Sequence, residues 1–225
     1  ANWEGVVMLD DIGKAEPHMA DAVPAMGVDQ VWENYGIYGE GISIAIVDTG
    51  VDNAHVGLDD MDDNQFTFDD MKVAAYYDAL QDAVICQPCL PGESLDSGTH
   101  GTHVAGIAAG TGAGEPAPDG TPHIGVAPKA NLVNVLSCCE GDIEDIIRGV
   151  EWTIANQKLV TPHIRVMTSS LGEQQVEFHI DNDGSSAWSQ AVDAAVQSGL
   201  VVTLSAGNEF GSLTAAGCNT IDSPG

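Results

Sequence analysis

Three short stretches of this chain hold side chains that could act together in nucleophilic catalysis. Asp48 follows the apolar run 42–47, His100 opens a run of small residues, and Asn208 follows the stretch 205–207. An imidazole can take the proton of a nucleophile, a carboxylate can orient that imidazole, and a side-chain amide can donate to an oxyanion. The order acid, base, oxyanion donor therefore predicts a catalytic set.

Each of these residues also has an ordinary structural interpretation. Asp48 begins an Asp-Thr-Gly sequence that could simply form a turn, and His100 could be a core histidine. His100 and His103, three residues apart, could also ligate a metal, but no carboxylate follows at a matching interval. The occurrence of all three residue types in order favours catalysis over these alternatives.

The elements expected to position these residues alternate between strands and helices. We expect helices near 21–32, 100–110, 142–154 and 188–198, and buried strands at 42–47, 131–136, 164–167 and 200–204. Such alternation predicts a parallel sheet with helices on its faces. Asp48, Ser170 and Asn208 would then lie at the carboxyl ends of strands, where functional residues of such sheets gather.

Taken together, four motifs resemble those of the subtilisin-like serine proteases. Residues 44–52 resemble the aspartate signature, 98–106 the histidine signature, 169–172 the substrate-binding strand, and 203–208 the strand end that carries the oxyanion-hole asparagine. With these motifs in the family order, the chain is identified as a member of this family. The resemblance implies an α/β, three-layer fold with a mainly parallel β-sheet flanked by helices, incomplete in this chain.

The resemblance also assigns roles to individual residues. It implies that His100 is the general base, that Asp48 holds the imidazole in the correct tautomer, and that Asn208 donates its amide to the developing oxyanion. His103 is the second histidine of the signature and is expected to be structural.

A substrate site follows from the same resemblance. Residues 170–172 would pair with an extended polypeptide as an added strand. Residues 170–172 and 205–207 together would line the pocket for the residue that precedes the scissile bond. Their small side chains leave room for a large apolar group, although a strand end and a tight turn would explain residues 170–172 equally well. The residues concerned are Ser170, Leu171 and Gly172, and Ser205, Ala206 and Gly207.

The family's Gly-Thr-Ser segment, which carries the nucleophile, does not occur between Asn208 and Gly225. A cleaved enzyme, a truncated chain, and an inactive relative that serves as a binding or structural module would each explain this. Because the motifs up to Asn208 are intact, we expect a serine endopeptidase with an Asp-His-Ser triad. Its serine would lie beyond residue 225, on a C-terminal fragment of the same protein, and this chain alone would be inactive.

Asp48 and His100 lie further apart than compact family members require. The stretch at about 57–97 is therefore expected to be a surface insertion in a peptidase domain that covers 21–225, preceded by an N-terminal extension or propeptide remnant at 1–20. Gly57 stands where compact members carry a calcium-binding aspartate. Catalysis needs no cofactor, and the Asp-rich run 59–63 is either a solvated loop or a structural calcium site.

The five cysteines include a Cys-x-x-Cys pair, Cys86 and Cys89, inside this stretch. The pair could be a disulfide that clamps a loop, a redox site or half of a zinc site, and its context favours the clamp. An odd number of cysteines leaves at least one free or bonded to another chain, with Cys218 the first candidate.

The charge of the chain restricts its partners. The 225 residues include 34 Asp and Glu against 6 Lys and Arg, a formal net charge of −28. Nucleic acids and anionic membranes would repel such a surface, and no apolar run approaches the roughly 20 residues that span a bilayer. The acidic surface predicts a salt-rich environment, and the family resemblance implies polypeptide substrates and a secreted, mature protein.

Overall fold

The computed structural model describes residues 19–62, 70–114, 116, 120–138, 142–172 and 184–207. Their helices and strands follow in the order α1 (Met19–Ala25), α2 (Val28–Tyr35), β1 (Ser43–Asp48), β2 (Val73–Asp78), β3 (Ala83–Cys86), α3 (His100–Ala109), β4 (Asn131–Leu136), α4 (Ile143–Asn156), β5 (Ile164–Ser169), α5 (Ala187–Gln197) and β6 (Val201–Leu204).

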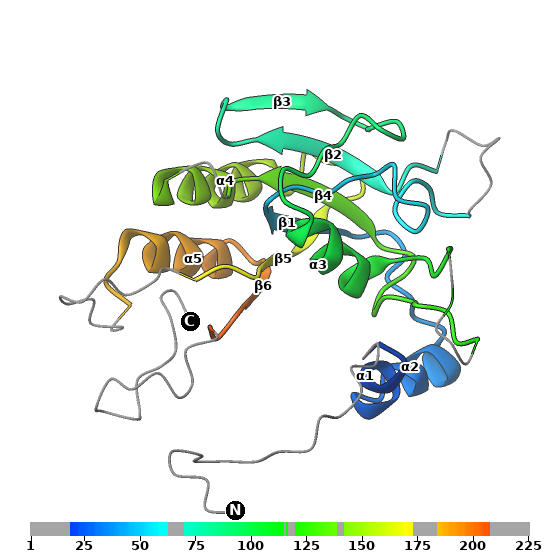
Figure 1. The fold of residues 1–225 in the computed structure, drawn as a ribbon. Coiled ribbons are helices and arrows are strands. Elements are labelled where there is room, and N and C mark those ends of the chain that lie inside the picture. The colour runs from blue at the N-terminus through cyan, green and yellow to red at the C-terminus, as the bar shows by residue number, and fades with distance from the viewer. Residues whose placement is uncertain are drawn as a thin grey trace, which may run out of the picture.

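The strands form one sheet in the order β3-β2-β4-β1-β5-β6 (Figure 1). Every pairing is parallel except that of β2 with β3. Strand β1 lies inside the sheet, between β4 and β5, and all six of its residues are buried. A strand so enclosed places its last residue, Asp48, at the carboxyl edge of the sheet with no freedom to swing into solvent.

Helices cover both faces of the sheet, as the alternating pattern predicted. Ala45 and Val47 of β1 belong to a core with residues of α4 and α5. Ile44 and Ile46 point the opposite way, into a second core with the small residues of α3. Figure 1 shows α4 and α5 on one face and α3 on the other. The expected three-layer α/β fold is confirmed.

Local sequence explains where the two larger helices begin and end. Asp142 and Asp145 form a reciprocal capping box at the start of α4, and the Ser186 hydroxyl accepts a hydrogen bond from Ser189 N at the start of α5. Gly199, with φ of 99°, follows α5 and lets the chain turn into β6.

Two segments differ from the expectation. The predicted helix at 21–32 is two short helices, because Gly27 adopts a positive φ of 73° between α1 and α2. Residues 73–78 of the long 57–97 stretch form β2, which is buried on both faces between β4 and β3. The sequence pattern predicted no strand there.

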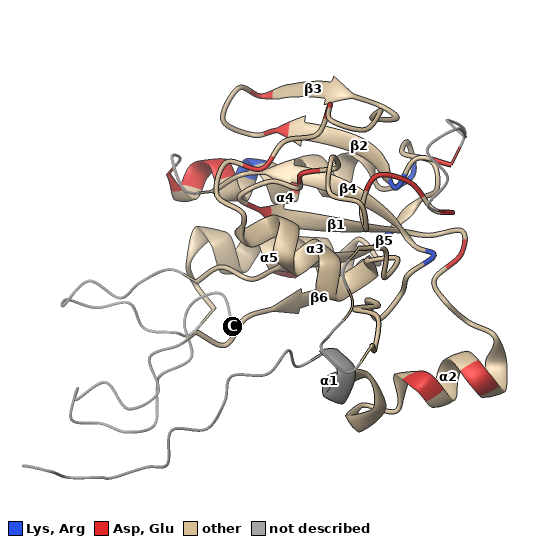
Figure 2. Ribbon diagram, turned by 45° about the vertical axis from the view of Figure 1, so that its right-hand side comes forward, with Lys and Arg blue, Asp and Glu red and all other residues tan. Residues whose placement is uncertain are grey.

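The remaining predictions about surface and covalent structure concern charge, membranes and cysteines. Figure 2 shows acidic residues on α2, α4 and the loops around the sheet, with few basic ones. Within the described ranges, no helix is both long and apolar enough to cross a membrane.

Cys86 and Cys89 form a disulfide at the end of β3, in agreement with the expectation that this pair clamps a loop. Cys138 is also disulfide-bonded.

Candidate active site at the carboxyl edge of the sheet

The structure brings Asp48 and His100 into direct contact. Nδ1 of His100 lies 2.7 Å from Oδ1 of Asp48, although the two residues are 52 positions apart in the chain. The Asp48 side chain is fully buried, whereas half of the His100 side chain is exposed. An ionised carboxylate only accepts hydrogen bonds, so the Asp48 contact favours the imidazole tautomer that carries its proton on Nδ1. In that tautomer Nε2 is free to accept a proton.

The close approach of β1 and α3 depends on glycine. A Cβ atom built on Gly101 would lie 2.1 Å from the backbone oxygen of Gly50, which is far inside van der Waals contact. Gly50 itself has φ of 118°, and a Cβ there would lie 2.3 Å from the Leu95 oxygen. These two glycines let the first turn of α3 lie against the segment that follows Asp48.

Helix α3 begins without the usual N-terminal cap. Thr99 precedes it with φ of 71° and makes no side-chain capping bond. The first backbone N–H groups bond elsewhere, Gly101 N to the hydroxyl of Thr49 at 2.9 Å and Thr102 N to Asp96 at 2.8 Å. The start of α3, where His100 lies, is therefore tied to the residue that follows Asp48.

The two predicted substrate segments lie side by side. Residues 170–172 follow β5 and residues 205–207 follow β6, its parallel neighbour. Ser205 N donates to the Ser169 oxygen at 3.2 Å, and the Ser205 hydroxyl donates to the Leu171 oxygen at 2.9 Å. Both segments are at the same edge of the sheet as Asp48. Asn208 lies outside the described residues.

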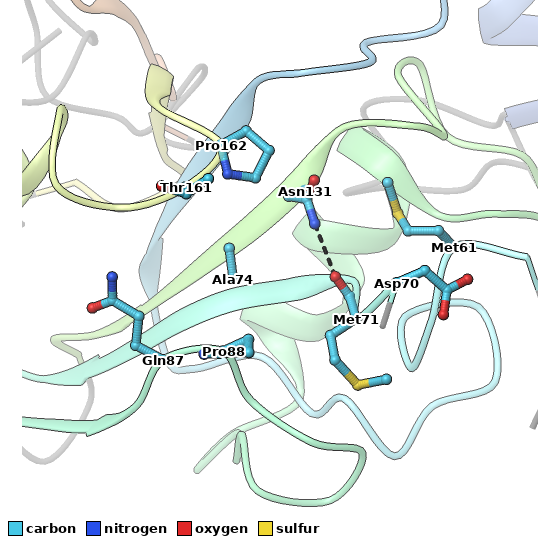
Figure 3. Close-up of a pocket in the computed structure, with 9 residues that line it drawn as sticks. All are labelled: Met61, Asp70, Met71, Ala74, Gln87, Pro88, Asn131, Thr161 and Pro162. Carbon is cyan, nitrogen blue, oxygen red and sulfur yellow. Dashed lines mark hydrogen bonds between the residues drawn. The ribbon is translucent and has the colours of Figure 1, made fainter. Parts of the chain in front are cut away.

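A hollow of about 580 Å³ is found at the opposite edge of the sheet. Figure 3 shows it between the amino-terminal ends of β2 and β4 and the loop before β5, with Asn131 donating to the Met71 oxygen at 2.8 Å. Its wall consists of Met61, Asp70, Met71, Ala74, Gln87, Pro88, Asn131, Thr161 and Pro162. Because it contains none of the predicted site residues, we do not count it as part of the active site.

Beside this hollow, three carboxylates of the Asp-rich region lie close together. Asp60, Asp62 and Asp70 each place an oxygen within 4.8 Å of the others, a spacing that a metal ion could bridge. The pKa of Asp70 is raised by burial and by the charges of Asp62 and Asp60. An acid whose pKa rises on folding costs stability once it ionises, so the ionisation of Asp70 opposes folding as the pH rises.

We expect Asp70→Asn to stabilise the complete protein in the presence of a chelator. Removal of one like charge is worth about 1 kcal/mol, or a Tm rise of about 2–4 °C at neutral pH. The gain should shrink as the pH is lowered towards 4, measured by thermal unfolding. A lower Tm for the variant in chelator would contradict this, and a calcium-dependent rise that only the parent shows would identify the cluster as the calcium site.

Comparisons with known proteins agree with these features. A family model described as Subtilase family matches residues 39–225. Subtilisin E of Bacillus subtilis is 31% identical over 197 residues, which is 84% of this chain and 41% of that protein. The minor extracellular protease Vpr of the same species is 34% identical over 196 residues, 85% of this chain and 20% of that protein.

A solved structure shows the same fold. The CspB protease of Clostridium perfringens superposes with a TM-score of 0.68 and 25% identity, covering 85% of this chain and 41% of that one. The chain thus spans less than half the length of each of these three relatives, while most of its own length is matched. By its sequence motifs, its fold and these relatives, the chain belongs to the subtilase family of serine peptidases.

Proposed function

We propose that this chain supplies the acid, the base and one oxyanion donor of a secreted, subtilisin-type serine endopeptidase. The observation that carries the proposal is the 2.7 Å contact between the buried carboxylate of Asp48 and Nδ1 of His100. The nucleophilic serine would come from a segment of the same protein beyond residue 225. Similarity to a relative named as an extracellular protease supports secretion.

The contact between Asp48 and His100 supports a distinct role for each residue during catalysis. Nε2 of His100 takes the proton of the serine hydroxyl as its oxygen attacks the peptide carbonyl carbon, and the imidazolium that forms is stabilised by Asp48. His100 then gives this proton to the leaving amine as the carbon–nitrogen bond breaks. A second cycle, with water in place of the serine, releases the acyl group. A triad of this kind requires no cofactor.

Substrate would bind along the segments that follow β5 and β6. Ser170, Leu171 and Gly172 offer backbone groups to an extended polypeptide, which would add to the sheet edge as a further strand. Residues 205–207 lie beside them through the Ser205 bonds and would complete the pocket next to the scissile bond. Asn208 would act on the carbonyl oxygen of the same peptide group.

The alternative is an inactive subtilase-like module that binds or supports other proteins. Labelling of the complete protein with a fluorophosphonate separates the two, because this probe reacts with a serine only when a functional base activates it. We expect stoichiometric labelling at neutral pH and high salt, with loss of peptide hydrolysis. A complete protein that is folded and takes up no label would overturn the proposal in favour of the inactive module.

A further inference from the structure

Asp96, four residues before His100, accepts an unusual number of hydrogen bonds for one side chain. Its Oδ1 accepts from the Thr49 hydroxyl at 2.7 Å and from Gly98 N at 2.8 Å. Its Oδ2 accepts from both the backbone N–H and the hydroxyl of Thr102. All the acceptor positions of the carboxylate are therefore in use, and each donor belongs to a segment next to the catalytic pair.

The donors connect Asp96 to both members of the pair. Thr49 directly follows Asp48, and its own N–H donates to Asp48 Oδ1 at 2.7 Å, the same oxygen that contacts His100. Thr102 lies in the first turn of α3, two residues after His100. Asp96 thus joins the end of β1 to the start of α3 through one side chain.

The Thr49 hydroxyl takes part in two hydrogen bonds, as donor in one and acceptor in the other. It donates to Asp96 and therefore presents its lone pairs to Gly101 N, which donates to it at 2.9 Å. Asp96 also takes the place of the missing N-cap, since Thr99 makes no side-chain bond to the helix. A negative group at this position is favoured by the helix dipole.

These contacts require an ionised carboxylate. Burial raises the pKa of Asp96, but the hydrogen bonds from Thr102, Thr49 and Gly98 outweigh it and hold that pKa below its usual value. An amide could accept at only one of its two ends, so at least one of the Thr49 and Thr102 contacts would be lost.

We propose that Asp96 is a positioning residue, which holds the imidazole of His100 against the carboxylate of Asp48 by fastening Thr49 to Thr102. The proposal rests on the catalytic roles proposed above for Asp48 and His100. Asp96 touches neither substrate nor reacting atoms, so it acts only through the geometry of the pair.

The test is Asp96→Asn in the complete protease, with kcat expressed per fluorophosphonate-titrated site. Because small displacements of a catalytic group cost up to about 100-fold in rate, we expect kcat to fall by about 10- to 100-fold, with KM within about twofold of the parent. Asp78→Asn is the matched control. Asp78 is a buried carboxylate that caps the turn after β2 through Leu80 N and Gln81 N, with strand β4 between it and Asp48. It should lower Tm and leave kcat per site unchanged.

A second readout does not depend on turnover. The proton shared by Asp48 and His100 should give a strongly deshielded ¹H NMR signal in the parent and in Asp78→Asn, and a shifted or lost signal in Asp96→Asn. A kcat per site within twofold of the parent together with an unchanged signal would overturn the positioning role. Failure of the proposed function would look different, because the parent itself would then take up no fluorophosphonate while the NMR comparison still tests Asp96.

Discussion

Substitution of His100 by alanine in the complete protease should lower kcat by about 10⁶-fold, the size of the loss known for the histidine of a subtilisin. The variant would lose the proposed base, whose Nδ1 contacts Asp48 and whose Nε2 would take the serine proton. Asp48→Asn should cost about 10⁴-fold, since an amide can hold the imidazole in the wrong tautomer. Both are measured as hydrolysis of a chromogenic peptide.

His123→Ala provides the control for this pair. His123 is exposed in the segment before β4, and we expect its variant to keep parental kcat and KM. The melting temperature of all three variants should be recorded, so that a loss of catalysis is distinguished from a loss of folded protein. Retention of more than a few per cent of parental activity by His100→Ala would exclude His100 as the base.

Gly101→Ala should damage both stability and activity severely, although it adds only one methyl group. The added carbon would lie 2.1 Å from the Gly50 oxygen and 3.1 Å from Asp48 Cβ, and neither belongs to a flexible side-chain end. Helix α3 would have to move away from β1, separating His100 from Asp48. We expect a stability loss of about 3 kcal/mol or more, with at least a 100-fold loss of kcat/KM.

Gly106→Ala, on the same helix, is the matched comparison. A Cβ at Gly106 meets no atom within 4 Å, so alanine should gain helix propensity of up to about 1 kcal/mol with activity unchanged. Thermal unfolding and peptide hydrolysis measured on both variants separate the two effects. Equal behaviour of the two glycine variants would show that the close approach of α3 to Gly50 does not determine the geometry of the pair.

The sequence predicted those elements whose own residues show an apolar run or a helix cap. The strands β1, β4, β5 and β6 are runs of apolar and β-branched residues, and the α4 cap at Asp142 is a local signal. Strand β2 was missed because Asp-rich and Pro-Gly sequences dominate the stretch around it, which was interpreted as a surface insertion. The run of valine, alanines and tyrosines at 73–77 is itself compatible with a buried strand. The break at Gly27 was missed because the apolar residues of 21–32 were interpreted as one continuous helix, and their spacing does not reveal the positive φ of that glycine.

The same distinction holds at the active site. Asp48 and His100 were recognised from their motifs, and the structure adds that they meet at the edge of the sheet. Asp96 was not recognised, because its proposed role depends on hydrogen bonds from Thr49, 47 residues earlier in the chain, and from Thr102 on α3. An aspartate four residues before a helix start has no pattern that distinguishes it from a solvent-facing loop residue. The roles assigned to Asn208 and to the substrate segments remain predictions.

The position of β1 has a consequence for when the contact between Asp48 and His100 can form. Both neighbours of this strand lie far along the chain, with Ser43 opposite Asn131 in β4 and opposite Ile164 in β5. Closing such long loops costs entropy before any pairing repays it, which makes parallel sheets slow to fold. The buried environment of the Asp48 carboxylate requires both of those distant strands to be in place. We therefore expect the contact between Asp48 and His100, and with it the proposed peptidase activity, to form late in folding.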